Sequence, residues 1–262
     1  ALIKVEAVNF EPPEKVRELL GFFGVASPEQ WKTVFAQPQA SFRLSTAVRR
    51  SEGSLAAWLR QGDLEARRVE CSPFDEATFR SHLKRIRRLT QDPIERSLKP
   101  MIELCAASGV AVVFVPHLKA CPVHGAARWV SPTKGVIQLS LRYKADDQLW
   151  FTFFHEAAHL LLHGKREVFV DTESLDGAQW EKEANAFASE FLIPKASLSP
   201  LRNAGERGRI SRAQVLDFAE RAEVSPGIAV GRLQFEGWLP RTHLNDLKQR
   251  IDWDRISQAL AA

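Results

Sequence analysis

The strongest constraint in this sequence is a helix-length segment, residues 146–163, that is apolar nearly all round yet contains three histidines and a glutamate. A helix of this kind has no polar face for solvent, so it belongs in the core of a globular protein. Burying imidazoles and a carboxylate without partners would be costly. The segment therefore predicts a buried helix whose polar groups share a partner, and a metal ion is the simplest partner.

The polar groups begin with the run His155-Glu156-Ala157-Ala158-His159. Residues four apart lie on one face of a helix, so both imidazoles can reach a single zinc ion. Glu156 would lie beside the open position and take a proton from zinc-bound water, whose pKa zinc lowers to about 7. The spacing predicts a hydrolytic zinc centre with Glu156 as general base. A chance match of this short pattern is the alternative, but it does not account for an apolar helix around the run.

A catalytic zinc site needs a third protein ligand. His163 lies a further turn along the same helix, too far to join the other two histidines on one ion, so we expect it at the helix end beside the site. The next helix, residues 180–193, offers glutamates at both edges of its apolar stripe. These are Glu183 and Glu190 at one edge and Glu181 at the other. Helix geometry leaves all three open, and solvated carboxylate is the usual role of such residues.

The remaining elements follow from hydrophobic period and from turn residues. We predict three short helices within residues 12–70, helices over 75–89 and 95–107, two helices within 211–235 and a last helix over 243–251. The predicted strands are 110–115, 126–130 and 136–141, with a turn at 131–135 between the last two. A polar loop extends to about residue 177, and another loop follows residue 194. The fold class is α+β: a small, mostly antiparallel sheet packed on the zinc helix, with helical N-terminal and C-terminal parts. We divide the chain into a helical region at 1–74, a peptidase core at 75–200 and a helical region at 201–262.

Three motifs in order resemble the ImmA/IrrE family of zinc metallo-endopeptidases. They are the run of residues 155–164, the segment Glu183-Ala184-Asn185-Ala186-Phe187-Ala188 and the segment Phe191-Leu192-Ile193-Pro194. Further similarity extends the resemblance over at least residues 110–250. The resemblance implies that Glu183 is the third zinc ligand. It also implies a protein substrate, a DNA-binding transcriptional repressor cut at a specific site, in stress-response or mobile-element regulation. Relatives often carry an N-terminal helix-turn-helix of the XRE type, and no run within residues 1–70 is recognisable as that module.

Two residues after the strand 136–141 are candidates for the catalytic machinery. Tyr143 is the only tyrosine of the chain, and Arg142 adjoins it. Both precede the zinc helix, and peptide hydrolysis needs donors for the developing oxyanion. We expect Tyr143 and Arg142 to contact the substrate or the oxyanion. The alternative is that they close a strand–helix corner.

Composition indicates the cellular location of the protein and the partners it can contact. No apolar run is long enough to span a bilayer, and three cysteines are too few for a secreted disulfide scaffold, so we expect a reduced, cytoplasmic protein without membrane contact. The net charge of +4 permits contact with nucleic acid but does not favour it. The basic helix 80–88 is read as a solvated face, and the pair Cys121 and His124 as loop residues.

Two other functions stay open at this point. The protein could sequester a partner without cutting it, as an antitoxin-like binding module, or bind DNA through the helix-turn-helix-like pair at 211–235. The turn of that pair has Glu223 where glycine is usual, which favours a packing role. The two histidines and a glutamate suit manganese or another divalent ion as well as zinc.

Overall fold

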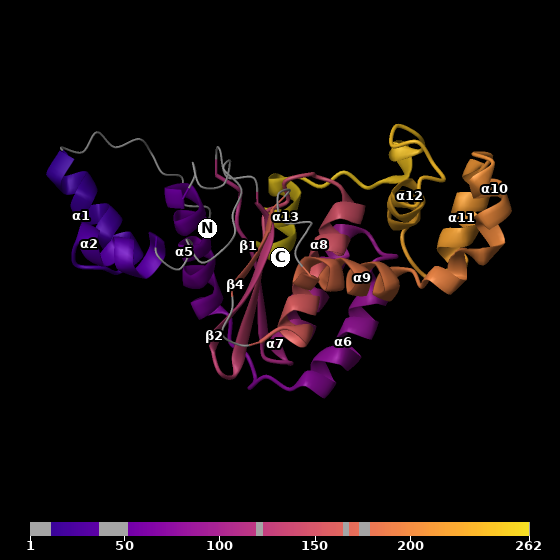
Figure 1. The fold of residues 1–262 in the computed structure, drawn as a ribbon. Helices are drawn as coiled ribbons and strands as arrows, with labels where there is room; N and C mark the ends of the chain where they lie inside the picture. The colour runs from indigo at the N-terminus through magenta and orange to yellow at the C-terminus, as the bar shows by residue number, and fades with distance from the viewer. Residues whose placement is uncertain (1–11, 37–51, 119–122, 165–167, 173–178, 262) are drawn as a thin grey trace.

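The computed structural model describes residues 12–36, 52–118, 123–164, 168–172 and 179–261 (Figure 1). The first helices are α1 (Pro12–Phe23), α2 (Pro28–Trp31) with the π-helix η1 (Lys32–Ala36), α5 (Glu52–Arg68), α6 (Glu76–Leu89) and α7 (Ile94–Ala106). The strands are β1 (Val110–Phe114), β2 (Val123–Ser131), β3 (Lys134–Leu139) and β4 (Val168–Thr172). The later helices are α8 (Asp146–Leu162), α9 (Gln179–Leu192), η2 (Lys195–Leu201), α10 (Arg202–Glu206), α11 (Arg212–Arg221), α12 (Pro226–Phe235), η3 (Asn245–Leu247) and α13 (Trp253–Ala261).

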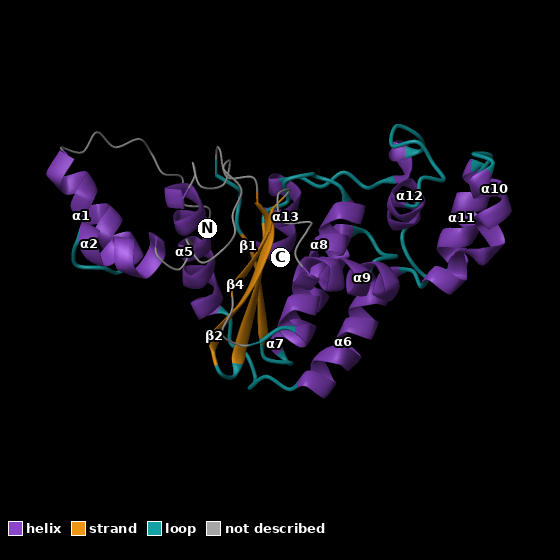
Figure 2. Cartoon of the chain, in the orientation of Figure 1, coloured by secondary structure: helices purple, strands orange, loops and turns teal. Residues whose placement is uncertain are grey.

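The strands form one mixed sheet in the order β1-β3-β2-β4. β1 pairs with β3 in parallel, whereas β2 pairs with both β3 and β4 in antiparallel fashion. Helix α5 covers one face of the sheet, and α7 and α8 lie on the other (Figure 2). The predicted α+β class and the mostly antiparallel pairing are therefore confirmed.

Strand β1 shows why the sheet needs cover on both faces. Its side chains alternate between two apolar clusters. Val110 and Val112 belong to the cluster that includes α8, whereas Ala111 and Val113 pack with Leu55 and the other buried residues of α5. A short strand that is apolar at every position is expected to be buried on both sides.

Helix α8 is joined to α12 through two buried aspartates at its N-terminus. A side chain at Gly227 would come within 2.4 Å of the Asp146 carboxylate, and one at Gly231 within 2.7 Å of Asp147. Residues four apart lie on one face of a helix, so these glycines let α12 approach the start of α8 closely. Asp147 also pairs with Lys248 at 2.7 Å. The C-terminal part is thereby fixed to the helix that carries the histidines.

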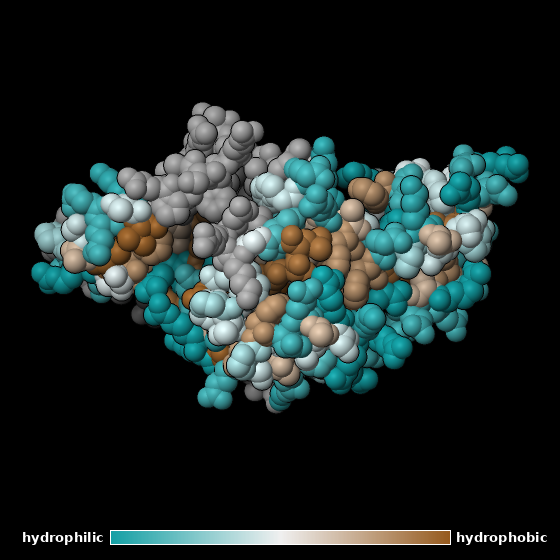
Figure 3. Space-filling view, turned by 60° about the horizontal axis from the view of Figure 1, so that its bottom comes forward, coloured by the Kyte–Doolittle hydropathy of each residue, from teal (hydrophilic) through white to brown (hydrophobic). Residues whose placement is uncertain are grey.

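The predicted N-terminal helices are present as α1, α2 and α5, and the N-cap of α2 is well formed. Ser27 accepts a hydrogen bond from the backbone of Gln30 and begins α2, with Pro28 next. Two apolar residues of α1 are nevertheless exposed, Val16 at 46% and Leu19 at 58%. Figure 3 shows hydrophobic residues gathered over this part of the molecule.

Several predicted segments were wrong. Strand β4 lies in the stretch predicted as a polar loop, the loop after residue 194 contains η2 and α10, and the turn at 131–135 is shortened because β2 ends at Ser131 and β3 begins at Lys134. The helix predicted over 243–251 reduces to η3, and the last helix is α13 instead. Leu244 has a left-handed φ of 57°, which interrupts a helix at that position. Among the described residues, no helix combines the length and apolar character needed to cross a bilayer.

Candidate metal centre

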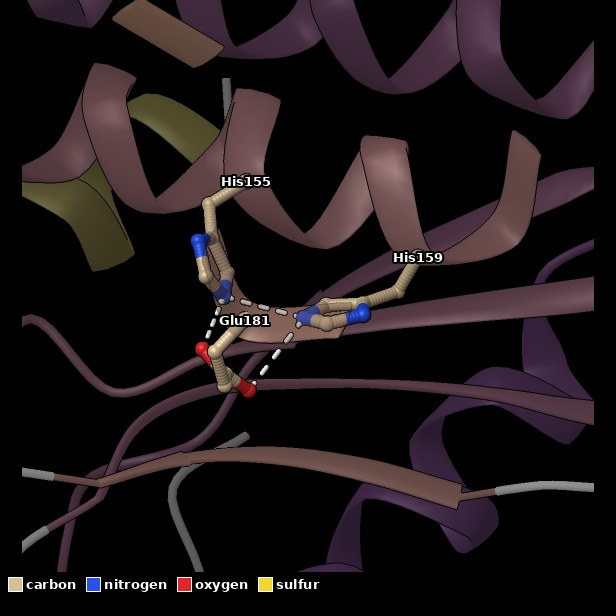
Figure 4. A group of neighbouring side chains, drawn as sticks. All are labelled: His155, His159 and Glu181. Atoms are coloured by element: carbon tan, nitrogen blue, oxygen red, sulfur yellow. Dashed lines mark hydrogen bonds and ion pairs between the residues drawn. The ribbon is translucent and has the colours of Figure 1, made fainter. Parts of the chain in front are cut away.

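Helix α8 presents His155 and His159 toward the start of α9 (Figure 4). Their spacing puts one imidazole a turn after the other, and their Nε2 atoms are 3.0 Å apart. The two residues are almost completely buried, at 1% and 0% exposure. The two imidazoles therefore converge, as their spacing predicts.

The third member of the group is Glu181, in the first turn of α9. Its Oε2 lies 3.1 Å from His155 Nε2, and its Oε1 lies 3.5 Å from His159 Nε2. Donor atoms of the three residues all lie within 4.8 Å of one another. Glu181 shares the buried face of α9 with Ala184 and Ala188, and these small side chains let the two helices approach closely. The carboxylate therefore reaches the histidines from the opposite helix.

The structure does not place Glu183 where the family resemblance put it. Glu183 is two residues further along α9, on another face of that helix, with 47% of its side chain exposed. Its Oε2 lies 3.3 Å from His163 Nε2, and its Oε1 accepts a hydrogen bond from Gln179. Of the three glutamates that the sequence left open, only Glu181 joins the histidines in the described part of the chain. The choice depends on the rotation of α9 against α8.

Hydrogen bonds at the far ring nitrogens orient both histidines. His155 Nδ1 lies 3.0 Å from Asn185 Oδ1, an acceptor, so the proton of that imidazole is on Nδ1. His159 Nδ1 lies 2.9 Å from His163 Nδ1, and His163 in turn faces the Glu183 carboxylate. The distances fit donation from His159 through His163 to Glu183. In the tautomers with a proton on Nδ1, both Nε2 atoms can present a lone pair to a metal ion.

Electrostatics favour the deprotonated form of this group. Burial lowers the pKa of His159 to about 4, and the neighbouring imidazoles act in the same direction. Burial alone would raise the pKa of Glu181, but its contacts with His155 and His159 outweigh burial and lower that pKa to about 2. At neutral pH His159 is thus neutral and Glu181 is ionised, which are the forms that bind metals.

The donor set fits a divalent cation. Two imidazole nitrogens and one carboxylate are the ligands of a common type of catalytic zinc site. Glu181 Oε1 is buried and accepts no hydrogen bond among the described residues. Three acceptors facing one another in a buried place are unfavourable unless a cation lies between them. The residues present therefore could hold a metal ion.

Glu156 lies on the sheet side of α8, where Gly125 of β2 makes room for it. A side chain at Gly125 would come within 2.5 Å of Glu156 Oε1 and within 2.8 Å of Thr152 Cγ2. Glu156 is fully buried. The glycine is needed here for close approach, since its backbone φ is not in the left-handed region. The sequence analysis did not identify Gly125, although an isolated glycine inside a strand is a known sign of close approach.

Two arginines fix the end of α9, and sequence analysis assigned neither. Arg87 of α6 donates to the carbonyls of Phe191 and Leu192 at 3.0 Å. Arg232 of α12 donates to the carbonyls of Ser189 and Ile193 at 2.8 Å. These carbonyls lie at the helix end that has no intrahelical donors. Arg87 was counted with the solvated face of the basic helix, but it is half-buried and holds α9 in place.

Arg142 and Tyr143 lie nearer the N-terminus of α8 than the histidines do. The Tyr143 ring stacks on His124 of β2 with centroids 4.7 Å apart, and the Arg142 guanidinium lies 5.7 Å from the Tyr143 centroid. The flanking residues Leu141 and Lys144 have φ of 54° and 52°. Such left-handed residues other than glycine are uncommon and concentrate at functional sites.

A small pocket connects this corner with the helix. Tyr143, His124 and Thr152 all line it, and Thr152 lies one turn before Glu156. The loop residue predicted at His124 is in fact part of β2, and Cys121 lies outside the described residues.

The comparison with protein families is consistent with this geometry. Residues 108–234 match the family model described as the IrrE N-terminal-like domain, a peptidase family. The matched segment runs from just before β1 to the last turn of α12 and includes both histidines, Glu156 and Glu181. A comparison with curated proteins gave no match. The residues that carry the metal centre therefore form an IrrE N-terminal-like domain, as the ImmA/IrrE resemblance implied.

Proposed function

We propose that this protein is a zinc-dependent endopeptidase whose metal ligands are His155, His159 and Glu181. The observation that carries the proposal is the convergence of two imidazoles and one carboxylate in one buried place. When bound, an ion of this kind acts as a Lewis acid that acidifies water and polarises a peptide carbonyl. Manganese or another divalent ion suits the same donors.

In this proposal Glu156 moves the protons. Its carboxylate takes a proton from the attacking water and later delivers one to the leaving amine. General acid–base catalysis of this kind contributes roughly 10²–10⁴-fold to the rate. The support is the position of Glu156 next to His155 in α8, with its side chain accommodated by Gly125.

We assign Tyr143 and Arg142 to substrate contact. Tyr143 is 50% exposed, and the pocket that it lines reaches Thr152, one turn from Glu156. A phenol and a guanidinium are both donors that can hold a substrate carbonyl. A Tyr143→Phe enzyme with full turnover would remove the hydroxyl from the mechanism.

The substrate we propose is a protein, namely a DNA-binding transcriptional repressor cut at a specific site, in stress-response or mobile-element regulation. This part of the proposal is supported by the match to the family model and by the resemblance of the motifs. A reducing, cytoplasmic setting agrees with the free thiols of Cys71 and Cys105.

The ligand assignment is tested by metal analysis of purified protein. The unsubstituted protein and the Glu183→Gln variant should each contain one zinc ion, whereas Glu181→Gln should lose most of it. These two substitutions make the same chemical change two residues apart on one helix, so they are matched. If zinc is instead retained in Glu181→Gln and lost in Glu183→Gln, the third ligand is Glu183.

The reaction is tested with the repressor encoded beside this protein. Incubation with the zinc-loaded protein should give discrete fragments, and Glu156→Gln should bind zinc normally but give none. If the regulatory effect in cells persists in Glu156→Gln, the protein acts by binding its partner and not by cutting it. A gel-shift assay at several salt concentrations tests DNA binding by the chain itself.

A further inference from the structure

An apolar pocket lies between α8, α9 and α12, on the side of His155 away from Glu181. It has a volume of about 360 Å³, which is in the range of small-ligand sites. Its lining includes Phe151, Leu192, Ile193, Ile228 and Phe235.

The pocket adjoins the metal centre directly. Asn185 lines it, and Asn185 Oδ1 is the group that fixes His155 Nδ1 at 3.0 Å. Phe151 lines it as well, and its ring centroid is 6.3 Å from that of His155. The imidazole of His155 contacts Asn185 of the lining through Nδ1 and Glu181 through Nε2. A substrate whose peptide bond lies at the metal could therefore place a neighbouring side chain in this pocket.

The lining indicates what kind of side chain fits. The two charged residues of the lining already have ion-pair partners: Arg232 pairs with Glu236 at 2.8 Å, and Asp147 pairs with Lys248 at 2.7 Å. With these charges compensated, the remaining walls are largely aliphatic and aromatic. Phe235 at the rim is 74% exposed, so a large apolar surface is available for contact. Such a surface favours an uncharged, apolar occupant.

We propose that this pocket binds an apolar side chain of the substrate residue next to the scissile bond, with Phe235 as a specificity-determining residue. The proposal rests on the proposed peptidase function. It deepens that function by naming the class of residue at which the substrate is cut.

Amino-acid hydroxamates provide a test that does not depend on turnover. These compounds bind a zinc ion through the hydroxamate and direct their side chain to the neighbouring pocket. Binding of glycine, leucine and phenylalanine hydroxamates to the zinc-loaded protein is measured by calorimetry. We expect the leucine or phenylalanine compound to bind about tenfold to hundredfold more tightly than the glycine compound, as burial of one such side chain predicts.

Variants connect that preference to the pocket. Ser189 lines the pocket, so Ser189→Trp should fill it and abolish the preference, and Phe235→Ala should reduce it. Ala186→Trp is the matched control, because it adds the same side chain to an exposed position of the same helix and should keep the preference.

The outcomes separate two kinds of failure. If glycine hydroxamate binds but the apolar compounds gain nothing, or if Ser189→Trp and Phe235→Ala leave the preference unchanged, the pocket is not the specificity site and the peptidase proposal stands. If none of the three hydroxamates binds to the zinc-loaded protein, the metal is not open to a substrate. In that case the peptidase proposal itself fails, and the pocket proposal fails with it.

Discussion

Glu183 and His163 lie outside the ligand group, yet hydrogen bonds connect them to it. The contacts run from His159 Nδ1 to His163 Nδ1 at 2.9 Å and from His163 Nε2 to Glu183 at 3.3 Å. Partners of this kind orient a ligating imidazole and raise its basicity, and their loss typically costs 10–100-fold in metal affinity. The resemblance was therefore informative about this part of the molecule, because Glu183 supports the site without facing the metal position.

The first prediction concerns that support. His163→Ala should weaken zinc binding by roughly 10–100-fold, and Glu183→Gln should have a smaller effect in the same direction. Affinities are measured by competition with a chromophoric chelator at constant pH. Glu190→Gln serves as control on the same helix, since Glu190 bonds the backbone of Lys195 and not a histidine. Equal affinities in all four proteins would show that the hydrogen bonds do not orient His159.

The second prediction concerns the space at Gly125. A Cβ there would lie 2.5 Å from Glu156 Oε1, so Gly125→Ala should displace the carboxylate while leaving the ligands in place. A misplacement of about 1 Å can cost roughly 10²-fold in rate, so we expect cleavage of the repressor to fall by at least about tenfold. Zinc content should stay the same. Gly53→Ala is the control, because no atom lies within 4 Å of its added Cβ.

At the scale of single residues, the sequence predicted the two histidines of the site but not the glutamate. Spacing along one helix placed His155 and His159 together, because both depend on a single local geometry. The choice between Glu181 and Glu183 depends on how α9 is rotated against α8, which is a tertiary property. The buried positions of Ala184 and Ala188 fix that rotation, and they bring Glu181 to the inside.

Among the elements, the junction of α8 and α12 contains a group whose ionisation makes stability depend on pH, Asp146. Burial raises the pKa of Asp146 to about 6, although hydrogen bonds from Ser225 and from the backbone of Gln249 oppose the shift. Its folded-state pKa lies above the ordinary value of 3.8, so the folded state holds this proton more tightly than the unfolded chain does. The resulting stabilisation is complete below pH 3.8 and is lost as the pH rises through about 6.

The third prediction follows from the loss of this stabilisation as the pH rises. Asp146→Asn removes the ionisation, so the metal-free variant should gain stability relative to the unsubstituted protein as the pH rises from 4 to 7. The gain should approach about 3 kcal/mol, which corresponds to a pKa shift of about 2 units. Urea unfolding at pH 4, 5.5 and 7 measures it. If the difference in free energy of unfolding between the two proteins stays constant from pH 4 to 7, the prediction is wrong.

Elements with a clear local signal were predicted, and elements defined by their partners were not. Asp75 caps α6 and Ser211 caps α11 through side-chain hydrogen bonds, and both helices were expected from sequence. Strand β4 was not predicted, although Val168, Phe169 and Val170 are strand formers. The polar residues on both sides of these three favoured a loop. Its existence depends on pairing with β2, which sequence alone does not show.

For the molecule as a whole, the metal should connect two helices that are far apart in sequence. Ligands from α8 and α9 converge, and the folded state binds the ion whereas the unfolded chain lacks a preformed site. The fourth prediction is that zinc at about 100 times its Kd raises the free energy of unfolding by about 2.7 kcal/mol. Thermal unfolding with and without a chelator measures the change. Glu181→Gln should show a much smaller change.

The division of the chain at residues 74 and 200 stays a prediction. The main apolar cluster contains residues from both sides of the second boundary, for example Leu192 and Val215. It also contains Phe79 and Leu83 of α6. Sequence composition does not reveal such connections, because they are contacts between helices whose apolar stripes look alike.

The position of Arg87 has a practical consequence for dissecting this protein. The family match begins at residue 108, but the guanidinium that holds the last carbonyls of α9 comes from α6, which lies before it. A fragment that begins at residue 108 would contain every proposed metal ligand. It would lack the hydrogen bonds from Arg87 to α9, the helix that supplies Glu181. The smallest autonomous catalytic unit should therefore begin at the cap of α6, Asp75, and retain α12 for the matching contact from Arg232.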